Sequence, residues 1–358
     1  MEETKLVETG KTTDFQSTLI DILNKSALSF MISIGHRTGL FDIMSGMGFS
    51  PYEEIAREAG LNERYLREWL GAMVTGGIID YKSGKYHLQH DHAGLLTRKS
   101  NADNLAVFMQ YSSLLGSVED DILQCFRSGG GVPYSKFKRF HEVMAEDSGQ
   151  SVLSSLETHI LPLVPGIRQK LESGISVLDV GCGAGRILNR LATHFPKSEF
   201  TGMDISEEAI RYAGEEAARQ SLFNVKFVIK DLSDFHETAP VEQFDFITSF
   251  DAIHDQAKPL NVLKGIYRAL KKDGIYLMQD ISGTGNLEED KKHLIGPFLY
   301  TVSCMHCMTV SLAQGGEGVG AMWGEEMIND YLRKAGFTSV IKNRLDHDIQ
   351  NYWFVVRR

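Results

Sequence analysis

The stretch Val177-Leu178-Asp179-Val180-Gly181-Cys182-Gly183-Ala184-Gly185-Arg186 decides the fold of this chain. An apolar run typical of a strand ends in three alternating glycines, and apolar residues at helical spacing follow from Ile187. Glycine has no β-carbon, so it permits both a tight strand-to-helix turn and the close approach of a ligand to the backbone. Crevices beside such turns are where open α/β sheets bind nucleotides. The stretch therefore predicts a nucleotide site at the carboxyl edge of a parallel sheet.

The spacing of the glycines argues against a dinucleotide. The G-x-G-x-x-G/A fingerprint requires glycine or alanine at position 186, which is Arg186 here. The third glycine comes one residue early and gives G-x-G-x-G after Asp179. Further strands are predicted downstream, and acids end the first three of the series. The predicted strands after the first are 199–204, 225–232, 244–250 and 274–280, with Asp204 and Asp231 as the downstream acids.

This series resembles the class I S-adenosylmethionine (SAM) methyltransferases, with the glycine stretch as their motif I. The resemblance covers about residues 165–358 and implies an α/β fold with a Rossmann-like, seven-stranded SAM methyltransferase domain. Strands at 339–345 and 352–356 would complete the sheet as the family's terminal hairpin, after a helix at 325–335. The implied cofactor is SAM, and the implied product is S-adenosylhomocysteine (SAH).

The resemblance also assigns cofactor contacts. The backbone around Gly181, Gly183 and Gly185 would hold SAM, and Asp179 would fix this loop or receive the SAM ammonium through water. Asp204 lies 19 residues after Gly185, where a carboxylate can accept hydrogen bonds from ribose hydroxyls. The remaining expected cofactor contacts are Ile205 beside that acid, Asp231 with Leu232 at the adenine, and Phe250 at the methionine moiety.

A candidate base follows the fourth strand. His254, in Phe250-Asp251-Ala252-Ile253-His254-Asp255, matches the histidine that deprotonates the acceptor in plant-type O-methyltransferases. Asp280, at the end of the fifth strand, would orient it, and Asp255 is the second candidate for that task. The following loop lacks the Trp-Ser-Asp-Glu of the plant enzymes and is shorter. The interpretation of His254 as a structural or substrate-positioning residue therefore stays open beside the catalytic one.

Two segments are expected to line the acceptor pocket. The resemblance places one wall in residues 101–172, and residues 283–323 form a segment too long for a plain turn. Their apolar, aromatic and methionine side chains favour a small, partly apolar acceptor, although both segments could equally be core. The candidate substrate contacts are Tyr134, Phe140, His141, Met144, Met305, His306 and Trp323. The run Cys304-Met305-His306-Cys307 offers too few ligands for a zinc site by itself, so no metal is expected.

The N-terminal third follows a different pattern. Apolar residues at helical spacing predict a helix over 14–34 that ends at Gly35. Ser50-Pro51-Tyr52-Glu53 matches a capping box and predicts a short helix. Asn62 then predicts the cap of a second helix, 62–75, and residues 78–88 predict a hairpin. Two helices followed by a hairpin are typical of a winged helix-turn-helix.

Winged helices commonly bind DNA, but here the second helix carries only Arg64 and Arg67 among glutamates. Relatives of plant-type O-methyltransferases use the same plan for dimerisation, which predicts a homodimer and makes nucleic acid an unlikely partner. The predicted domains are a winged-helix dimerisation domain (1–98), a helical linker contributing to the acceptor pocket (99–165) and the methyltransferase domain (166–358). A SAM-sensing transcription regulator and an N- or S-methyltransferase remain alternatives.

Composition agrees with an enzyme of small molecules. Lys+Arg 37 against Asp+Glu 47 gives a net charge of −10, which repels phosphates and anionic membranes. No apolar run suits a membrane span, and the first fifteen residues do not resemble a signal peptide. Four cysteines in 358 residues suggest a reducing compartment. A cytoplasmic location is therefore expected.

Overall fold

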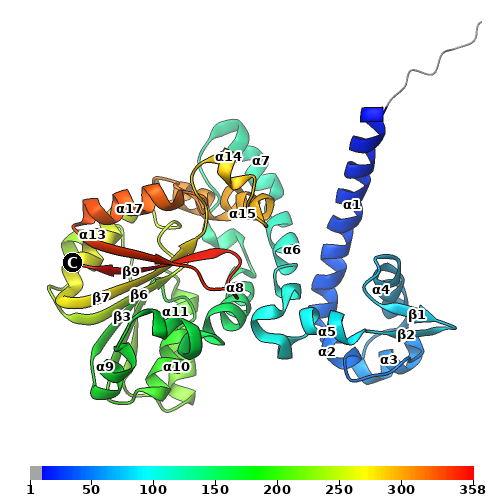
Figure 1. The fold of residues 1–358 in the computed structure, drawn as a ribbon, viewed down its shortest axis with the longest axis horizontal. Coiled ribbons are helices and arrows are strands. Elements are labelled where there is room, and N and C mark those ends of the chain that lie inside the picture. The colour runs from blue at the N-terminus through cyan, green and yellow to red at the C-terminus, as the bar shows by residue number, and fades with distance from the viewer. Residues whose placement is uncertain (1–9) are drawn as a thin grey trace, which may run out of the picture. The chain divides into compact units, whose positions relative to one another are not determined.

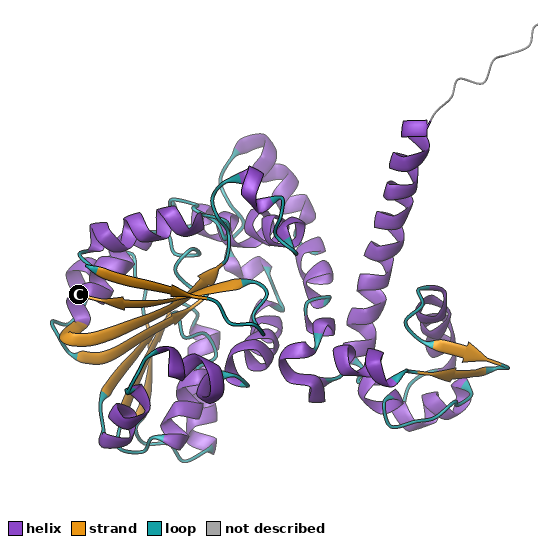
Figure 2. Ribbon diagram, viewed as in Figure 1, coloured by secondary structure: helices purple, strands orange, loops and turns teal. Residues whose placement is uncertain are grey.

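The computed structural model describes the backbone of residues 10–358 (Figures 1 and 2). Its internal contacts divide the chain into an N-terminal unit, Met1–Ser113, and a C-terminal unit, Leu114–Arg358. This division falls within the segment 99–165 that the sequence predicts to be a linker. In the described part of the chain, no helix combines the length and apolarity that crossing a bilayer requires.

The N-terminal unit is a helical domain with one small hairpin. Its elements are α1 (Gly10–Arg37), α2 (Leu40–Met44), α3 (Tyr52–Ala59), α4 (Glu63–Thr75), β1 (Asp80–Lys82), β2 (Lys85–His87), α5 (His90–Leu96), two 3₁₀ turns at Arg98–Asp103 and Leu105–Val107, and α6 (Gln110–Gly116), which crosses into the next unit. A core of buried side chains, with Phe41, Trp69 and Leu70 at its centre, joins α2, α3 and α4. The predicted winged-helix plan is confirmed.

The first helix continues through Gly35, so the predicted stop at that glycine is wrong. Gly35 serves packing instead, because a β-carbon there would lie 2.5 Å from the Trp69 ring and 2.8 Å from Phe41. The Trp69 indole nitrogen also donates to the Met31 carbonyl at 2.7 Å. The close approach of α4 to α1 therefore requires a residue without a side chain at position 35.

The predicted caps have mixed outcomes. The Asn62 side chain accepts hydrogen bonds from the backbone of Arg64 and Tyr65, as the sequence predicts. Ser50 caps no helix, because Pro51 is the N-cap of α3 and makes no side-chain cap bond. The backbone of Ser50 instead pairs with Tyr86 at the base of the hairpin. Ser50 therefore pairs with the hairpin instead of forming the predicted capping box.

The C-terminal unit begins with helices and short turns. These are α7 (Glu119–Ser128), α8 (Phe140–Ser148), α9 (Ile167–Ser173), 3₁₀ turns at Tyr134–Lys136 and Leu161–Leu163, and single π turns at Gly149–Leu153 and Leu156–Ile160. The strands that follow are β3 (Ser176–Val180), β4 (Glu199–Asp204), β5 (Val225–Ile229), β6 (Phe244–Phe250), β7 (Leu270–Ile281), β8 (Ser339–Asn343) and β9 (Asn351–Arg357). The intervening helices are α10 (Arg186–His194), α11 (Glu207–Arg219), α12 (Phe235–Thr238), α13 (Pro259–Ala269), α14 (Leu287–Asp290), α15 (Gly296–Val302), α16 (Met308–Ala313) and α17 (Gly324–Ala335), with a π turn at Ser303–Cys307.

The seven strands form one sheet in the order β5-β4-β3-β6-β7-β9-β8. The first five in the chain are parallel, and β9 runs antiparallel to both β7 and β8. The chain leaves β3 toward β4 and β5 and later returns to the other side of β3 as β6. The carboxyl ends of β3 and β6 therefore flank a topological switch point, where α/β sheets bind ligands. The predicted seven-stranded, Rossmann-like fold is confirmed.

Helices cover both faces of this sheet (Figure 1). One buried apolar cluster joins α12, α13 and α17 to the sheet, and a second joins α9, α10 and the turns at 149–163 to its other face. Strands covered on both faces must bury most of their side chains, as β3 and the second half of β7 do. Because helices cover both faces of the sheet, polar side chains can gather at its carboxyl edge.

Candidate functional site

The glycine loop after β3 is shaped by three left-handed residues. Gly181, Gly183 and Gly185 have φ angles of 74°, 49° and 67°. A β-carbon on Gly181 would lie 2.4 Å from that of Ala252, and one on Gly185 would lie 2.5 Å from the Phe227 ring. At Gly183 a β-carbon would point into open space. Two of the glycines are therefore needed for packing, whereas Gly183 leaves bare backbone facing the crevice.

Asp204 fastens this loop to the next strand. Its Oδ2 accepts a hydrogen bond from the Gly183 backbone at 2.8 Å, and its Oδ1 accepts one from the Ser206 backbone at 2.8 Å. The backbone nitrogens of Gly181 and Cys182 also donate to the Met203 carbonyl. Asp204, which the sequence assigns to the ribose, therefore also holds the glycine loop in place, a contact that the sequence did not predict.

Asp179 is a buried carboxyl at the end of β3. Its side chain accepts a hydrogen bond from the Thr248 hydroxyl at 2.7 Å and is only 2% exposed. Burial, together with the nearby charge of Asp204, raises the pKa of Asp179 to about 7, although the hydrogen bond from Thr248 acts in the opposite direction. The group is therefore poised to change its charge near neutral pH.

Asp231 follows β5 in a local turn. Its Oδ1 accepts hydrogen bonds from the Ser233 hydroxyl at 2.7 Å and the Ser233 backbone at 2.8 Å. These bonds lower the pKa of Asp231, so the carboxylate stays ionised. Leu232 beside it is buried, and Ile205, after β4, is half exposed. Phe250 packs on Trp353 with ring centroids 6.0 Å apart.

These residues line a single cavity of about 590 Å³ in the C-terminal unit. Its size suits a nucleoside-sized ligand with a small partner. The predicted site residues on its wall are Asp179, Gly181, Gly183, Asp204, Ile205, Asp231, Leu232 and Phe250 together with Tyr134, Phe140, His141 and Met144. The structure thus brings most of the predicted cofactor and acceptor residues to one cavity.

Six predicted site residues lie outside this wall. Gly185 packs between α11 and β5, and Met305 is half-buried in the π turn Ser303–Cys307. His306 stacks on the Phe140 ring with centroids 3.7 Å apart and so supports the wall from behind. Trp323 is buried and donates its indole hydrogen to Asp280 at 3.0 Å. The remaining two are His254 and Asp280, which form a buried pair.

A sharp turn after β6 places His254. Asp251 adopts φ 48°, a left-handed value that is rare for residues other than glycine. The chain therefore bends at the end of β6, which packs Ala252 against Gly181 and directs His254 toward β7. His254 Nδ1 lies 2.7 Å from Asp280 Oδ1, and its Nε2 lies 3.3 Å from Asp255 Oδ1. The imidazole is held between two carboxylates.

The charge of His254 follows from these two contacts. Burial alone lowers the pKa of His254, but the carboxylates of Asp280 and Asp255 outweigh that effect and place the pKa well above 6.5. Burial raises the pKa of Asp255 itself, which the charge of His254 counteracts. Asp255 lies on the cavity wall, with 13% of its side chain exposed, whereas His254 lies one layer deeper.

Two residues near His254 were missed as site residues by sequence reasoning. Asp255 was only the second candidate for orienting His254, yet it is the acid that faces the cavity. Cys307 was considered only within its own run, and its thiol hydrogen-bonds to both His254 and Asp255. The signal for Cys307 was present in Cys304-Met305-His306-Cys307, but no pattern linked this run to residues fifty positions earlier.

The N-terminal unit has little sign of a DNA-reading surface in its described residues. Arg64 of α4 forms an ion pair with Glu68 on the same helix, and Arg67 lies over the Tyr52 ring at 5.9 Å. The two basic residues of the would-be reading helix are thus engaged locally. The interpretation as a DNA-binding helix gains no support from them.

Comparisons with known families agree with this architecture. Residues 26–98 match the family described as Rv2258c-like winged HTH domain, and residues 171–331 match the family described as Methyltransferase domain. Among curated proteins, (S)-coclaurine N-methyltransferase of Papaver somniferum is 32% identical over 114 residues, which are 32% of this chain and 32% of that protein. Malonyl-[acyl-carrier protein] O-methyltransferase of Bacillus cereus is 28% identical over 160 residues, which are 45% of this chain and 52% of that protein.

Solved structures resemble nearly the whole chain. The mitomycin 7-O-methyltransferase has a TM-score of 0.68 at 17% identity, covering 98% of this chain and 100% of its own. Human N-acetylserotonin methyltransferase, solved in complex with SAM, has a TM-score of 0.64 at 17% identity, covering 99% of both chains. At such identity the likeness shows the fold, whereas the chain spans only about a third to a half of the two curated relatives above.

Proposed function

We propose that this chain, which belongs to the SAM-dependent methyltransferases and carries their catalytic domain behind a winged helix-turn-helix domain, methylates a hydroxyl group of a small, partly apolar acceptor. The observation that carries the hydroxyl assignment is the buried pair of His254 and Asp280 beside the cavity. A hydroxyl must lose its proton during methyl transfer, so it benefits from a positioned base more than a thiolate or neutral amine does.

SAM fits the polar half of the cavity. Bare backbone at Gly183 and the carboxylates of Asp179, Asp204 and Asp231 line it. SAM carries an ammonium group, a sulfonium and ribose hydroxyls, all of which acidic side chains favour. The corresponding assignments of the ribose to Asp204 and the adenine to Asp231 with Leu232 remain part of this proposal.

The acceptor fits the other half, where aromatic side chains gather. Tyr134 stacks on His141 with ring centroids 5.7 Å apart and meets Phe140 edge-on at 5.2 Å. His141 Nε2 in turn lies 3.1 Å from the Ser206 hydroxyl, which follows the cofactor loop. Flat aromatic surfaces with a few polar groups select a small, partly apolar molecule.

The positions of the acceptor, of SAM and of the proposed base indicate the catalytic steps. Binding would align the acceptor oxygen behind the methyl group and exclude water, which supplies most of the rate. The hydroxyl proton would pass to the Asp255 carboxylate on the cavity wall and from there to Nε2 of His254, 3.3 Å away, while Asp280 holds the imidazole through Nδ1. The oxygen–methyl bond forms as the sulfonium–methyl bond breaks, and neutral SAH departs.

A labelled-methyl assay tests this proposal. The full chain would be incubated with SAM carrying an isotopically labelled methyl group and with matched aromatic acceptors that differ only in bearing a hydroxyl, an amine or a thiol. Mass spectrometry should find the label on oxygen. Label on nitrogen or sulfur only would overturn the hydroxyl assignment, and failure of the folded chain to bind either SAM or SAH would overturn the enzyme assignment.

Binding of SAM should release a proton near neutral pH. Because the pKa of Asp179 is raised to about 7, much of this carboxyl is protonated there. A bound cation lowers that pKa, so Asp179 gives up its proton and SAM affinity rises as the pH increases through about 7. Calorimetry at pH 7 in two buffers of different ionisation enthalpy should give different binding heats. The Asp179→Asn variant should lose this difference, and equal heats for the unmodified chain would contradict the role.

The exposed apolar face of α1 should hold two copies of the chain together. Leu19, Ile22 and Leu23 are each more than half exposed, and Leu23 reaches 69%. Light scattering should therefore give twice the chain mass of 40.0 kDa. The double variant Leu19→Glu/Leu23→Glu should give a single chain mass, whereas Phe223→Glu, at a residue 96% exposed in the other unit, should not change the mass. A monomeric unmodified chain would contradict this prediction.

A further inference from the structure

We propose that His254, Asp255 and Cys307 form a binding site for one divalent transition-metal ion of the zinc type, open toward the cavity. The ligand atoms are the imidazole Nε2, a carboxylate oxygen and the thiol sulfur. In sequence the ligands lie in two segments about fifty residues apart, and the fold alone brings them together. The sequence predicted no metal because the run ending at Cys307 lacked further ligands, and the loop after β6 supplies two.

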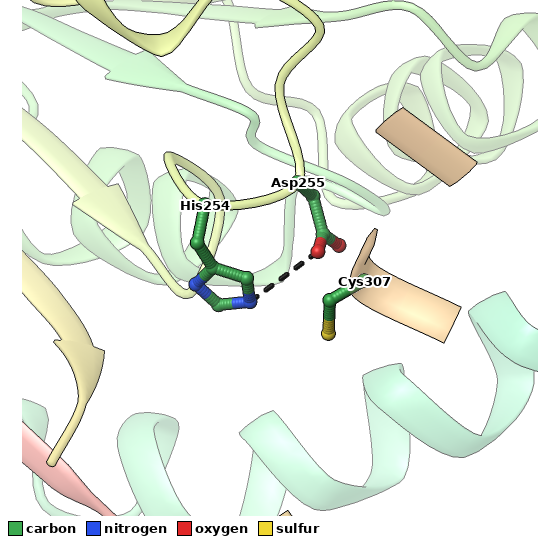
Figure 3. Close-up of side chains that lie close together, drawn as sticks. All are labelled: His254, Asp255 and Cys307. Atoms are coloured by element: carbon green, nitrogen blue, oxygen red, sulfur yellow. Dashed lines mark ion pairs between the residues drawn. The ribbon is translucent and has the colours of Figure 1, made fainter. Parts of the chain in front are cut away.

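The geometry of the three atoms suits a metal. One potential ligand atom from each residue lies within 4.8 Å of the other two, and Nε2 of His254 lies 3.3 Å from Oδ1 of Asp255. Ligands of a tetrahedral zinc ion, with bonds of about 2.0–2.3 Å, stand roughly 3.3–3.7 Å apart. Figure 3 shows the His254 ring and the Asp255 carboxylate facing each other, with the Cys307 thiol beside them; the first two come from the loop after β6 and Cys307 from the π turn Ser303–Cys307. Closing around an ion therefore requires only small movements of side chains.

The surroundings of His254 prepare it as a ligand. In a metal-binding histidine, the N–H of the second ring nitrogen normally donates a hydrogen bond to a carboxylate, which fixes the tautomer and the ring orientation. Asp280 provides this contact at 2.7 Å to Nδ1. Asp280 is itself held by the Trp323 indole at 3.0 Å and by the Ile281 backbone at 2.9 Å. The Nε2 atom is thereby directed at Asp255 and Cys307.

The charges of the cluster also favour a cation. Asp251, Asp255 and Asp280 are acids placed around the imidazole of His254, and His306 Nδ1 also lies 3.8 Å from Asp255. Binding would release the thiol proton, and the thiolate with the Asp255 carboxylate would neutralise a divalent ion. Nitrogen, oxygen and sulfur ligands together are those that zinc accepts, whereas magnesium and calcium require oxygen ligands.

The fourth position of the ion would face the acceptor. Asp255 and its neighbour Gln256 lie on the cavity wall, so a site with three protein ligands keeps one position open there. The role of the ion rests on the proposed function. An acceptor hydroxyl that coordinates the ion would lose its proton to water more readily. The resulting alkoxide or phenolate oxygen would then attack the methyl group. In the metal-loaded chain, His254 holds the ion; in the metal-free chain, it accepts the proton.

A cobalt titration tests the site without SAM or acceptor. The metal-stripped full chain, kept reduced with a phosphine, would be titrated with Co²⁺ at neutral pH. We expect a thiolate-to-cobalt charge-transfer band in the near ultraviolet that saturates at one ion per chain and disappears on adding Zn²⁺. Cys307→Ser should remove this band, and Asp280→Asn should weaken binding by about 10–100-fold.

Cys304→Ser is the matched control, because Cys304 lies in the same π turn but outside the cluster. It should keep the band. Absence of the band from the unmodified chain overturns the proposal whether or not any variant folds, and so does a band that survives Cys307→Ser. Because the readout involves no methyl transfer, a missing band leaves the methyltransferase proposal standing, and a missing methyl product leaves the metal site standing.

Discussion

The His254→Ala variant should lose about 10²–10⁴-fold in turnover while binding SAM as tightly as the unmodified chain. The loss is expected because, in the proposed function, His254 accepts the acceptor's proton, and His254 itself is not among the residues that line the cavity where SAM would lie. Single-turnover methyl transfer to a hydroxyl acceptor and calorimetry of SAH binding measure the two quantities separately. Retained turnover in a folded variant would move the nucleophile from oxygen to sulfur or nitrogen.

The pH dependence of the same reaction checks the histidine independently. A base must be neutral to accept a proton, and the carboxylates of Asp280 and Asp255 hold the pKa of His254 well above 6.5 despite its burial. The rate should therefore still be rising with pH above 6.5. The Asp280→Asn variant removes one of the two charges, so the rise should shift to lower pH. An unchanged profile in that variant would exclude Asp280 as the positioning residue.

The Asp204→Ala variant should weaken SAM binding by at least about tenfold. A hydrogen bond to a charged group contributes roughly 1.5–3 kcal/mol, which corresponds to this factor or more. Asp204 also accepts from the backbone of Gly183 and Ser206, so its removal frees the glycine loop as well as the proposed ribose contact. Calorimetry with SAM and with SAH measures the effect.

Asp234→Ala provides a control for this variant. Asp234 is an exposed acid in the segment between β5 and α12. Its ion pair with Lys230 is long, at 3.7 Å. Its replacement should leave SAM affinity unchanged. An Asp204→Ala protein that is folded and binds SAM normally would exclude Asp204 from cofactor binding, whatever the outcome at His254.

The strands were predictable because their signal is local. The predicted bounds match β4 and β6 to the residue and the start of β3 to within one residue, whereas β5 ends three residues earlier and β7 begins four residues earlier than predicted. The helix caps were less predictable. Asn62 capped α4 as predicted, but Ser50 pairs with Tyr86 and Gly35 packs against Trp69, so partners remote in sequence overrode two local signals. Local patterns hold where no distant partner competes.

The candidate site shows the same difference between local signals, which were predictable, and long-range contacts, which were not. Glycines, acids and strand ends recur at fixed spacings, so the sequence indicated which residues of β3, β4, β5 and β6 meet at one sheet edge. It could not show that Asp255 rather than His254 faces the cavity, because that depends on the bend at Asp251. Nor could it show that His306 supports Phe140 from behind while Trp323 holds Asp280.

The sequence by itself determined the parallel sheet, its glycine loop and the family of the C-terminal domain, because these depend on short-range spacing within single strand-turn-helix units. Only the tertiary structure decided that Cys307 lies beside His254 and Asp255. Contacts between segments far apart in the chain produce no pattern of residue spacing in the sequence, because packing rather than local propensity brings these segments together.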